Sequence, residues 1–108
     1  LGLANLAVHH EQLQSDAWGD LLCFAGIGPG EVVLNNSDRV SKVVGISQRR
    51  SRDSARFQCT LYMEWNPHIV GQYLKSIPGS LDEVVPRVSP VSATRRQLVD
   101  TFVSYLPL

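Results

Sequence analysis

The stretch "KVVGISQRRSRDSARFQCTLYMEW", residues 42–65, carries the clearest secondary-structure signal in this chain of 108 residues. Apolar and polar side chains alternate over its last nine positions, 57–65. The apolar positions are Phe57, Cys59, Leu61, Met63 and Trp65. A period of two residues predicts a strand with one buried face, and it places Cys59 in the core. Residues 42–48 form a shorter apolar run and predict a second strand of the same sheet.

The segments on either side of this stretch predict strands first and helices afterwards. Residues 31–34 predict a strand that pairs with residues 42–48 across a turn at 35–38. Asn66 and Pro67 predict the start of a short helix, and a second helix follows from about residue 93, where Thr94 and Gln97 match a capping box. The polar residues 11–20 predict a connection. This order predicts an α+β fold with an antiparallel or mixed sheet and helices packed on it.

The composition is typical of one globular domain with an uneven distribution of charge. Apolar residues make up 44% of the chain and charged residues 19%, with a net charge of zero. Residues 39–56 contain six basic side chains and one acidic side chain, so this segment carries +5 and the rest of the chain −5. A field of this sign suits an anionic ligand or an acidic protein. Nucleic acid is a weaker candidate, because no aromatic residue precedes Phe57 in the basic segment.

Metal, disulfide and membrane roles are not predicted. Cys23 and Cys59 are too few for a disulfide framework, and neither shows the ligand spacing of a zinc site. No apolar run reaches the length of a transmembrane segment. The expected location is therefore the cytoplasm, without a membrane partner.

Lys42 is a candidate functional residue because it begins an otherwise apolar strand. A lysine at a strand end is most often simply solvated, and that alternative stays open at this point. Gly45 favours a functional role, because a glycine within a strand often marks the close approach of a ligand. A lysine ammonium beside such a glycine suits an anionic or carbonyl-bearing group.

Cys23 is a second candidate, because it lies just before the glycine-rich segment "GIGPGE" at residues 26–31. A turn of this kind can expose a thiol and offer backbone N–H groups to an oxyanion, as thioester chemistry requires. The structural alternative is a small buried apolar side chain, which is the commonest role of a free cysteine.

Four segments together resemble the lipoate–protein ligase and octanoyltransferase family, whose catalytic domain is related to that of biotin–protein ligase and is class II synthetase-like. The segments are "CFAGIGPGEVVL" (23–34), "KVVGISQRR" (42–50), "RFQCTLYMEWNP" (56–67) and "VPRVSPV" (85–91). The second of them matches the family pattern K-[IV]-x-G-x-x-Q. The resemblance runs from about residue 21 to the end of the chain.

The resemblance implies a role for each candidate residue. Lys42 would contact the carboxyl or phosphate end of an activated acyl group and help to pass the acyl group to an acceptor lysine. Gly45 would let the acyl donor lie close to the strand, and Gln48 would support it. In the cysteine-dependent transferases, Cys23 would carry the acyl group as a thioester.

The implied reaction attaches a lipoyl or octanoyl group to the lysine of a lipoyl carrier domain, in a 2-oxoacid dehydrogenase or the glycine cleavage protein. A ligase would use ATP with Mg²⁺, whereas a transferase would use no cofactor. The sequence leaves open ligase against transferase and lipoate against octanoate.

Two departures from the family bear on this expectation. The chain has the longer segment "NNSDRVS" (35–41) where the family has a glycine-containing tight turn, and it lacks the family's amino-terminal half with its Arg-Arg-x-Gly-Gly-Gly-like segment. Residues 1–108 are therefore expected to be the carboxy-terminal portion of such a domain: a fragment, one subunit of a split enzyme, or a degenerate homologue. It would not be active alone, and the amino-terminal half would be a partner.

A different class of function also fits the sequence. The basic segment 49–56 could dock an acidic protein or a nucleic acid in a non-catalytic binding module.

Overall fold

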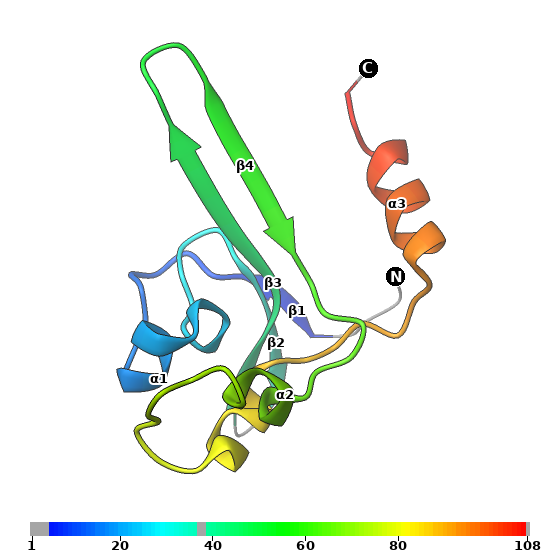
Figure 1. Cartoon of the computed structure of the whole chain (residues 1–108). Helices are drawn as coiled ribbons and strands as arrows, with labels where there is room; N and C mark the ends of the chain where they lie inside the picture. The colour runs from blue at the N-terminus through cyan, green and yellow to red at the C-terminus, as the bar shows by residue number, and fades with distance from the viewer. Residues whose placement is uncertain (1–4, 37–38, 108) are drawn as a thin grey trace.

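The computed structural model describes residues 5–36 and 39–107, which form an α+β fold around one antiparallel sheet (Figure 1). The strands are β1 (Leu6–Val8), β2 (Val32–Asn36), β3 (Arg39–Arg50) and β4 (Ala55–Thr60), in the order β1-β2-β3-β4. All three pairings between neighbouring strands are antiparallel, so the sheet is antiparallel rather than mixed. A separate parallel bridge joins Lys42 to Val88 and brings the carboxy-terminal segment against β3. The predicted turn at 35–38 falls partly on residues 37–38, which lie outside the described residues.

The helices are short, and their starts follow the capping signals of the sequence. Asn66 caps α2 with its side chain, and the Thr94–Gln97 capping box at the start of α3 is present in full, as predicted. The predicted connection at 11–20 is wrong, because Asp16 caps a further helix, α1, through the N–H groups of Trp18 and Gly19. The helical segments are α1 (Ala17–Leu21), α2 (Pro67–Gly71), α3 (Arg95–Ser104) and the 3₁₀ turns η1 (Cys23–Ala25), η2 (Leu81–Glu83) and η3 (Val85–Arg87).

The small core joins segments that are far apart in the sequence. Trp18 of α1 packs with Ala25 and with the fully buried Val84, which lies between η2 and η3. The indole Nε1 of Trp18 donates a hydrogen bond to Glu83 Oε2 at 2.9 Å, and the indole of Trp65 donates to the Val84 carbonyl at 3.3 Å. Both indole N–H groups are therefore satisfied where their rings are buried.

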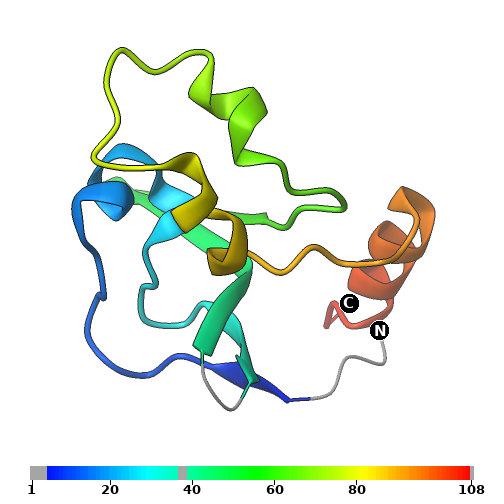
Figure 2. The same ribbon diagram turned by 90° about the horizontal axis from the view of Figure 1, so that it is seen from below.

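The β3–β4 hairpin extends beyond the rest of the molecule in Figure 1, and Figure 2 views the molecule from below. The predicted half-buried strand at 57–65 is wrong in two respects: β4 ends at Thr60, and every residue of β4 is exposed, including Cys59. The alternation has no buried face here because no other described element covers either side of the hairpin. A period of two shows that a segment can bury one face, but burial also needs a second layer.

The expectation that helices pack on the sheet holds for the short segments only. The turns η1 and η3 lie against β3, whereas α3 lies apart from the sheet in both views. The apolar positions Val99, Phe102 and Val103 of α3 are 52%, 61% and 49% exposed. No helix in the described residues has the length and hydropathy needed to cross a bilayer.

Candidate functional site

Lys42 is buried within the sheet, so the expectation of a solvated lysine is wrong. Its side chain is 4% exposed, and its Nζ donates to Glu31 Oε1 at 2.9 Å and to the Cys23 carbonyl at 3.2 Å. The same nitrogen lies 4.7 Å from the centroid of the Phe24 ring, within the range of a cation–π contact. All three N–H directions of the ammonium therefore face a protein group.

Glu31 is the partner that compensates the buried charge of Lys42. Besides the ion pair, its carboxylate accepts the N–H of Gly28 at 2.6 Å and the N–H of Ile46 at 2.7 Å. A buried ion pair is tolerated when further hydrogen bonds satisfy both ions, and that condition is met here. The pair connects β2, β3 and the glycine-rich turn at one point.

Sequence reasoning missed Glu31, although the sequence contains a signal for it. A hairpin with its turn at 35–38 would place Glu31 directly opposite Lys42. In the observed register Lys42 lies opposite Val33, two residues from Glu31, so the two charged residues are diagonal neighbours. A single acid and a single base on two apolar paired strands therefore indicate a buried ion pair.

The glycine-rich turn binds a carboxylate of the protein itself, that of Glu31. The N–H of Gly28 donates to the Glu31 carboxylate. The other N–H groups of the turn donate to backbone carbonyls: Gly26 to Cys23, Ile27 to Gln14, Gly30 to His9 and Glu31 to Gly28. Pro29 has no N–H to offer. The expected oxyanion-binding turn is therefore not formed in this structure, because its donors are already engaged.

Gly45 is a glycine because an aromatic ring lies against it. A Cβ at this position would come within 2.6 Å of Phe24 Cε2 and 3.3 Å of Glu31 Oε2. Phe24 is held in place by Tyr62, whose ring centroid lies 4.9 Å away at an interplanar angle of 90°. The room that Gly45 leaves is therefore filled by Phe24, and a ligand could lie beside Gly45 only if that ring turned away.

The four residues singled out from the sequence come together in space. Cys23, Lys42, Gly45 and Gln48 all line one cleft of about 670 Å³. Cys23 is exposed, so its thiol is accessible, whereas Lys42 lies at the bottom beneath Phe24. The cleft thus combines an accessible sulfur, a buried ammonium and the strand that leads into the hairpin.

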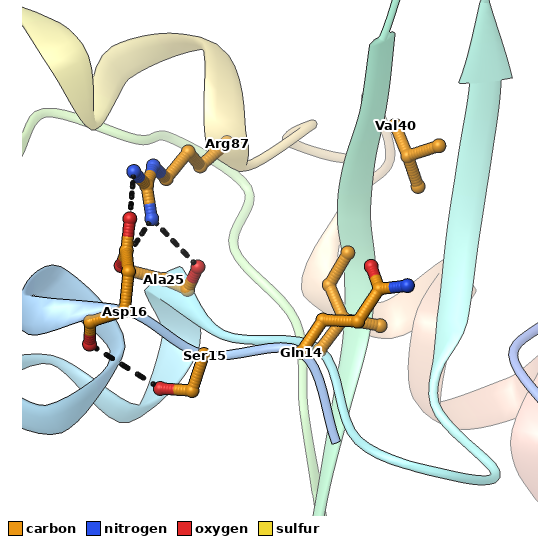
Figure 3. Close-up of a pocket in the computed structure, with 7 residues that line it drawn as sticks. Gln14, Ser15, Asp16, Ala25, Val40 and Arg87 are labelled. Atoms are coloured by element: carbon orange, nitrogen blue, oxygen red, sulfur yellow. Dashed lines mark hydrogen bonds and ion pairs between the residues drawn. The ribbon is translucent and has the colours of Figure 1, made fainter. Parts of the chain in front are cut away.

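A second pocket, of about 310 Å³, lies on the other side of the glycine-rich segment (Figure 3). Arg87 extends from η3 to Asp16, and its Nη1 and Nη2 donate to Oδ1 and Oδ2 at 2.8 and 2.6 Å. Hydrogen bonding to Arg87, and then to the Gly19 N–H, holds the pKa of Asp16 well below its usual range. Both charges are matched within the protein, so this pocket has a structural role and clamps η3 to α1.

The candidate ligands for a metal ion and for a phosphate group can each be checked against the described residues. No group of three or more His, Cys, Asp or Glu side chains within residues 5–36 and 39–107 is arranged to hold a metal ion. The glycine-rich turn does not fit a phosphate group, because its N–H groups are engaged internally. No step that uses ATP or Mg²⁺ is assigned to these residues.

No family model matches the chain, and neither a curated protein nor a solved structure matches it. The chemistry of the cleft is therefore inferred from its own geometry.

Proposed function

We propose that this chain is part of an acyl-transferring catalytic domain of the biotin/lipoate protein ligase type, and that its cleft handles a lipoyl or octanoyl group. The acceptor is the lysine of a lipoyl carrier domain, in a 2-oxoacid dehydrogenase or the glycine cleavage protein. One observation supports this above all others: Cys23, Lys42, Gly45 and Gln48 line the same cleft. The family resemblance implies a role in acyl transfer for each of these four residues. They span 26 positions of the sequence and line one cleft.

Lys42 supplies a fixed positive charge to the cleft. Glu31 keeps the ammonium in place, so its position does not depend on the ligand. An acyl carbonyl or carboxyl oxygen reaches Nζ by replacing the Cys23 carbonyl or the Phe24 ring, which are the two contacts weaker than the ion pair. A preorganised ammonium of this kind stabilises negative charge that develops on the acyl oxygen.

In the transferase form of the reaction, Cys23 carries the acyl group between two exchanges. Its thiolate attacks the carbonyl carbon of a thioester donor, the new C–S bond forms, and the donor leaves as a thiolate that takes a proton from water. The neutral amine of the acceptor lysine then attacks the Cys23 thioester. An amide forms, the cysteine thiolate leaves, and the proton of the amine passes to water.

The ligase form differs in its cofactor and in its need for Cys23. ATP with Mg²⁺ would activate the acid at a site outside the residues described here, whereas the transferase form needs neither. A longer protein that contains an amino-terminal half of the domain is the natural setting for either form. We place the reaction in the cytoplasm, where free thiols such as Cys23 stay reduced.

The decisive experiment separates chemistry at Lys42 from its structural pairing with Glu31. Lys42→Met and the double variant Glu31→Gln/Lys42→Met are assayed for octanoyl transfer to a lipoyl carrier domain, in the chain and in any longer protein that contains it. The double variant removes both buried charges and so restores stability. We expect it to fold and to lose transfer by at least about a hundredfold, because the positioned positive charge is gone.

Lys75, the other lysine of the chain, provides the matched control, because Lys75→Met removes an exposed ammonium that does not line the cleft. Full activity in the folded double variant would overturn the proposal. Intact-mass measurement after incubation with octanoyl-coenzyme A then distinguishes the two forms. An octanoyl adduct that is absent in Cys23→Ser identifies the transferase, and activity of Cys23→Ser with ATP identifies the ligase.

A further inference from the structure

The outer half of the β3–β4 hairpin is a well-formed structure whose side-chain hydrogen bonds are all local, such as that from Arg50 Nε to Gln48 Oε1 at 3.0 Å. Residues 46–60 are all exposed, and the turn is held by Ser51 and Ser54, whose hydroxyls lie 2.9 Å apart and whose backbones also bond. The hairpin therefore has an ordered shape although nothing described in the chain packs on it.

The charges of this hairpin are unmatched. It contains Arg49, Arg50, Arg52 and Arg56 against a single acidic residue, Asp53. The ion pairs formed within the described residues involve Lys42, His68, Arg87 and Arg96, and none of them includes a hairpin arginine. The rest of the chain is net negative, so the basic character is concentrated where no internal partner lies.

The two faces of the hairpin differ in a way that defines a binding pattern. Arg49 lies opposite Arg56, so both side chains share one face. On the other face Gln48 lies opposite Phe57, which is 58% exposed, and the next pair is Ile46 with Cys59. Arg50, opposite Ala55, lies at the outer end of this second face. The first face is thus basic and polar, and the second is apolar except for Gln48 and Arg50.

The backbone of β4 offers a free edge. β4 is the last strand in the order β1-β2-β3-β4, and its outer side pairs with no other described segment. Every second N–H and C=O group of an edge strand points outward and is ready to pair with another chain. Charged edges protect against unspecific pairing, and they also select partners of opposite charge.

We propose that the hairpin binds an extended acidic segment of a partner protein as a fifth strand along β4. Acidic residues at alternate positions would lie on the face of Arg49 and Arg56, and apolar residues between them would lie beside Phe57. This docking does not depend on acyl transfer. Because Gln48 lines the cleft and Arg49 begins the basic face, a partner bound here lies next to the cleft.

The free edge favours a protein over a nucleic acid. A nucleic acid would contact the arginines, but it would leave the outward N–H and C=O groups of β4 without strand partners. Phe57 is also the only aromatic side chain among residues 46–60, too few for a stacking surface along several bases.

The test uses the full chain and a labelled eight-residue peptide in which glutamate and valine alternate, with binding followed by fluorescence anisotropy. Two further peptides serve as comparisons: one with the glutamates grouped at one end, and one with lysine in place of glutamate. We expect the alternating peptide to bind most tightly, the grouped peptide more weakly and the lysine peptide not at all. Hydrogen exchange should show new protection at alternate amides of β4 on binding.

The charge contribution is measured with matched variants. Arg49→Gln/Arg56→Gln should weaken binding about tenfold, whereas Arg95→Gln/Arg96→Gln in α3 removes the same charge elsewhere and should change it less than about twofold. Equal losses in both variants would overturn the proposal, because the attraction would then be unspecific. Tighter binding of a thymidine oligonucleotide than of the peptide, lost in the hairpin variant, would overturn it in favour of nucleic acid.

Discussion

The two halves of β3 differ in how their charged side chains are compensated. Residues 41–45 are buried or half-buried, and their one charged side chain, Lys42, has a carboxylate partner at 2.9 Å. Residues 46–50 are all exposed, and Arg49 and Arg50 have no ion-pair partner among the described residues. The strand is continuous, but residues 39–44 pair with β2 and residues 45–50 pair with β4.

The difference between the halves comes from what lies across the strand. The inner half is covered by η1 and η3, so its charge had to be paired within the protein. The outer half is covered by no described element, so water solvates its charges and they stay available to a partner. Burial therefore fixes the ammonium of Lys42 beside Glu31, whereas exposure leaves the charges of the arginines free for recognition.

The largest effect should come from breaking the ion pair in the inner half. Lys42→Met leaves the Glu31 carboxylate buried without its cation, and we expect it to lower the free energy of unfolding by about 3–5 kcal/mol. Glu31→Gln/Lys42→Met should recover most of that loss, because neither charge is then buried. Urea denaturation followed by tryptophan fluorescence measures both. A double variant no more stable than the single one would show that the charge imbalance is not the cause.

A smaller loss should follow from adding one methyl group to the inner half. Gly45→Ala places a Cβ within 2.6 Å of the Phe24 ring, and displacing that ring should cost about 1–3 kcal/mol. Phe24→Leu/Gly45→Ala should be less destabilised than the sum of the two single variants, because the smaller side chain makes room. Additive losses in this double-mutant cycle would mean that Phe24 does not restrict position 45.

A pH-dependent effect of smaller size should come from the Asp16–Arg87 clamp. The folded pKa of Asp16 is lowered, so its contribution to stability is present above the unfolded pKa of about 4 and is lost as the pH falls below it. Asp16→Asn keeps a side-chain acceptor for the α1 cap but removes the ion pair, so it should weaken the pH dependence of unfolding below about pH 4. Arg87→Gln should weaken the pH dependence in the same way. The effects of Asp16→Asn and Arg87→Gln should not be additive, because both remove the same ion pair. An unchanged acid slope in both variants would contradict the role of the clamp.

The smallest effect should come from the outer half. Arg49 and Arg56 are cross-strand neighbours of like charge, so Arg49→Glu should stabilise the hairpin by about 0.2–1 kcal/mol. The same substitution should weaken binding of the acidic peptide. Thermal denaturation measures the first effect and anisotropy the second. A destabilised Arg49→Glu variant would show that the arginine makes an internal contact.

Local features of the fold could be predicted from the sequence, because their causes are local. The hairpin of β2 and β3 follows from a turn between apolar runs, and the start of α3 follows from the Thr94–Gln97 capping box. The exposure of Cys59 could not be predicted, because alternation does not reveal whether a second layer exists. The burial of Trp18 depends on Glu83 and Val84, which are distant in the sequence and carry no pattern that links them to it.

The sequence pointed to residues that share one cleft, but it did not reveal the contacts within that cleft. Cys23, Lys42 and Gly45 were selected by residue type and spacing, and they line one cleft. Glu31 was missed because a charge at the start of an apolar strand is commonly solvated. Phe24 was missed because only the three-dimensional structure shows a ring against Gly45.

The core contact between Trp18 and Glu83 has a consequence for the order in which the molecule folds. The two residues are 65 positions apart, and Asp16 and Arg87, which clamp the same region, are 71 apart. The β2–β3–β4 meander closes over short loops, which form faster than contacts between distant residues. During synthesis from the amino terminus, the Trp18 indole therefore waits in water until η2 and η3 have left the ribosome. The core is the last part of the described fold to close, although Trp18 is made long before its partners in η2 and η3.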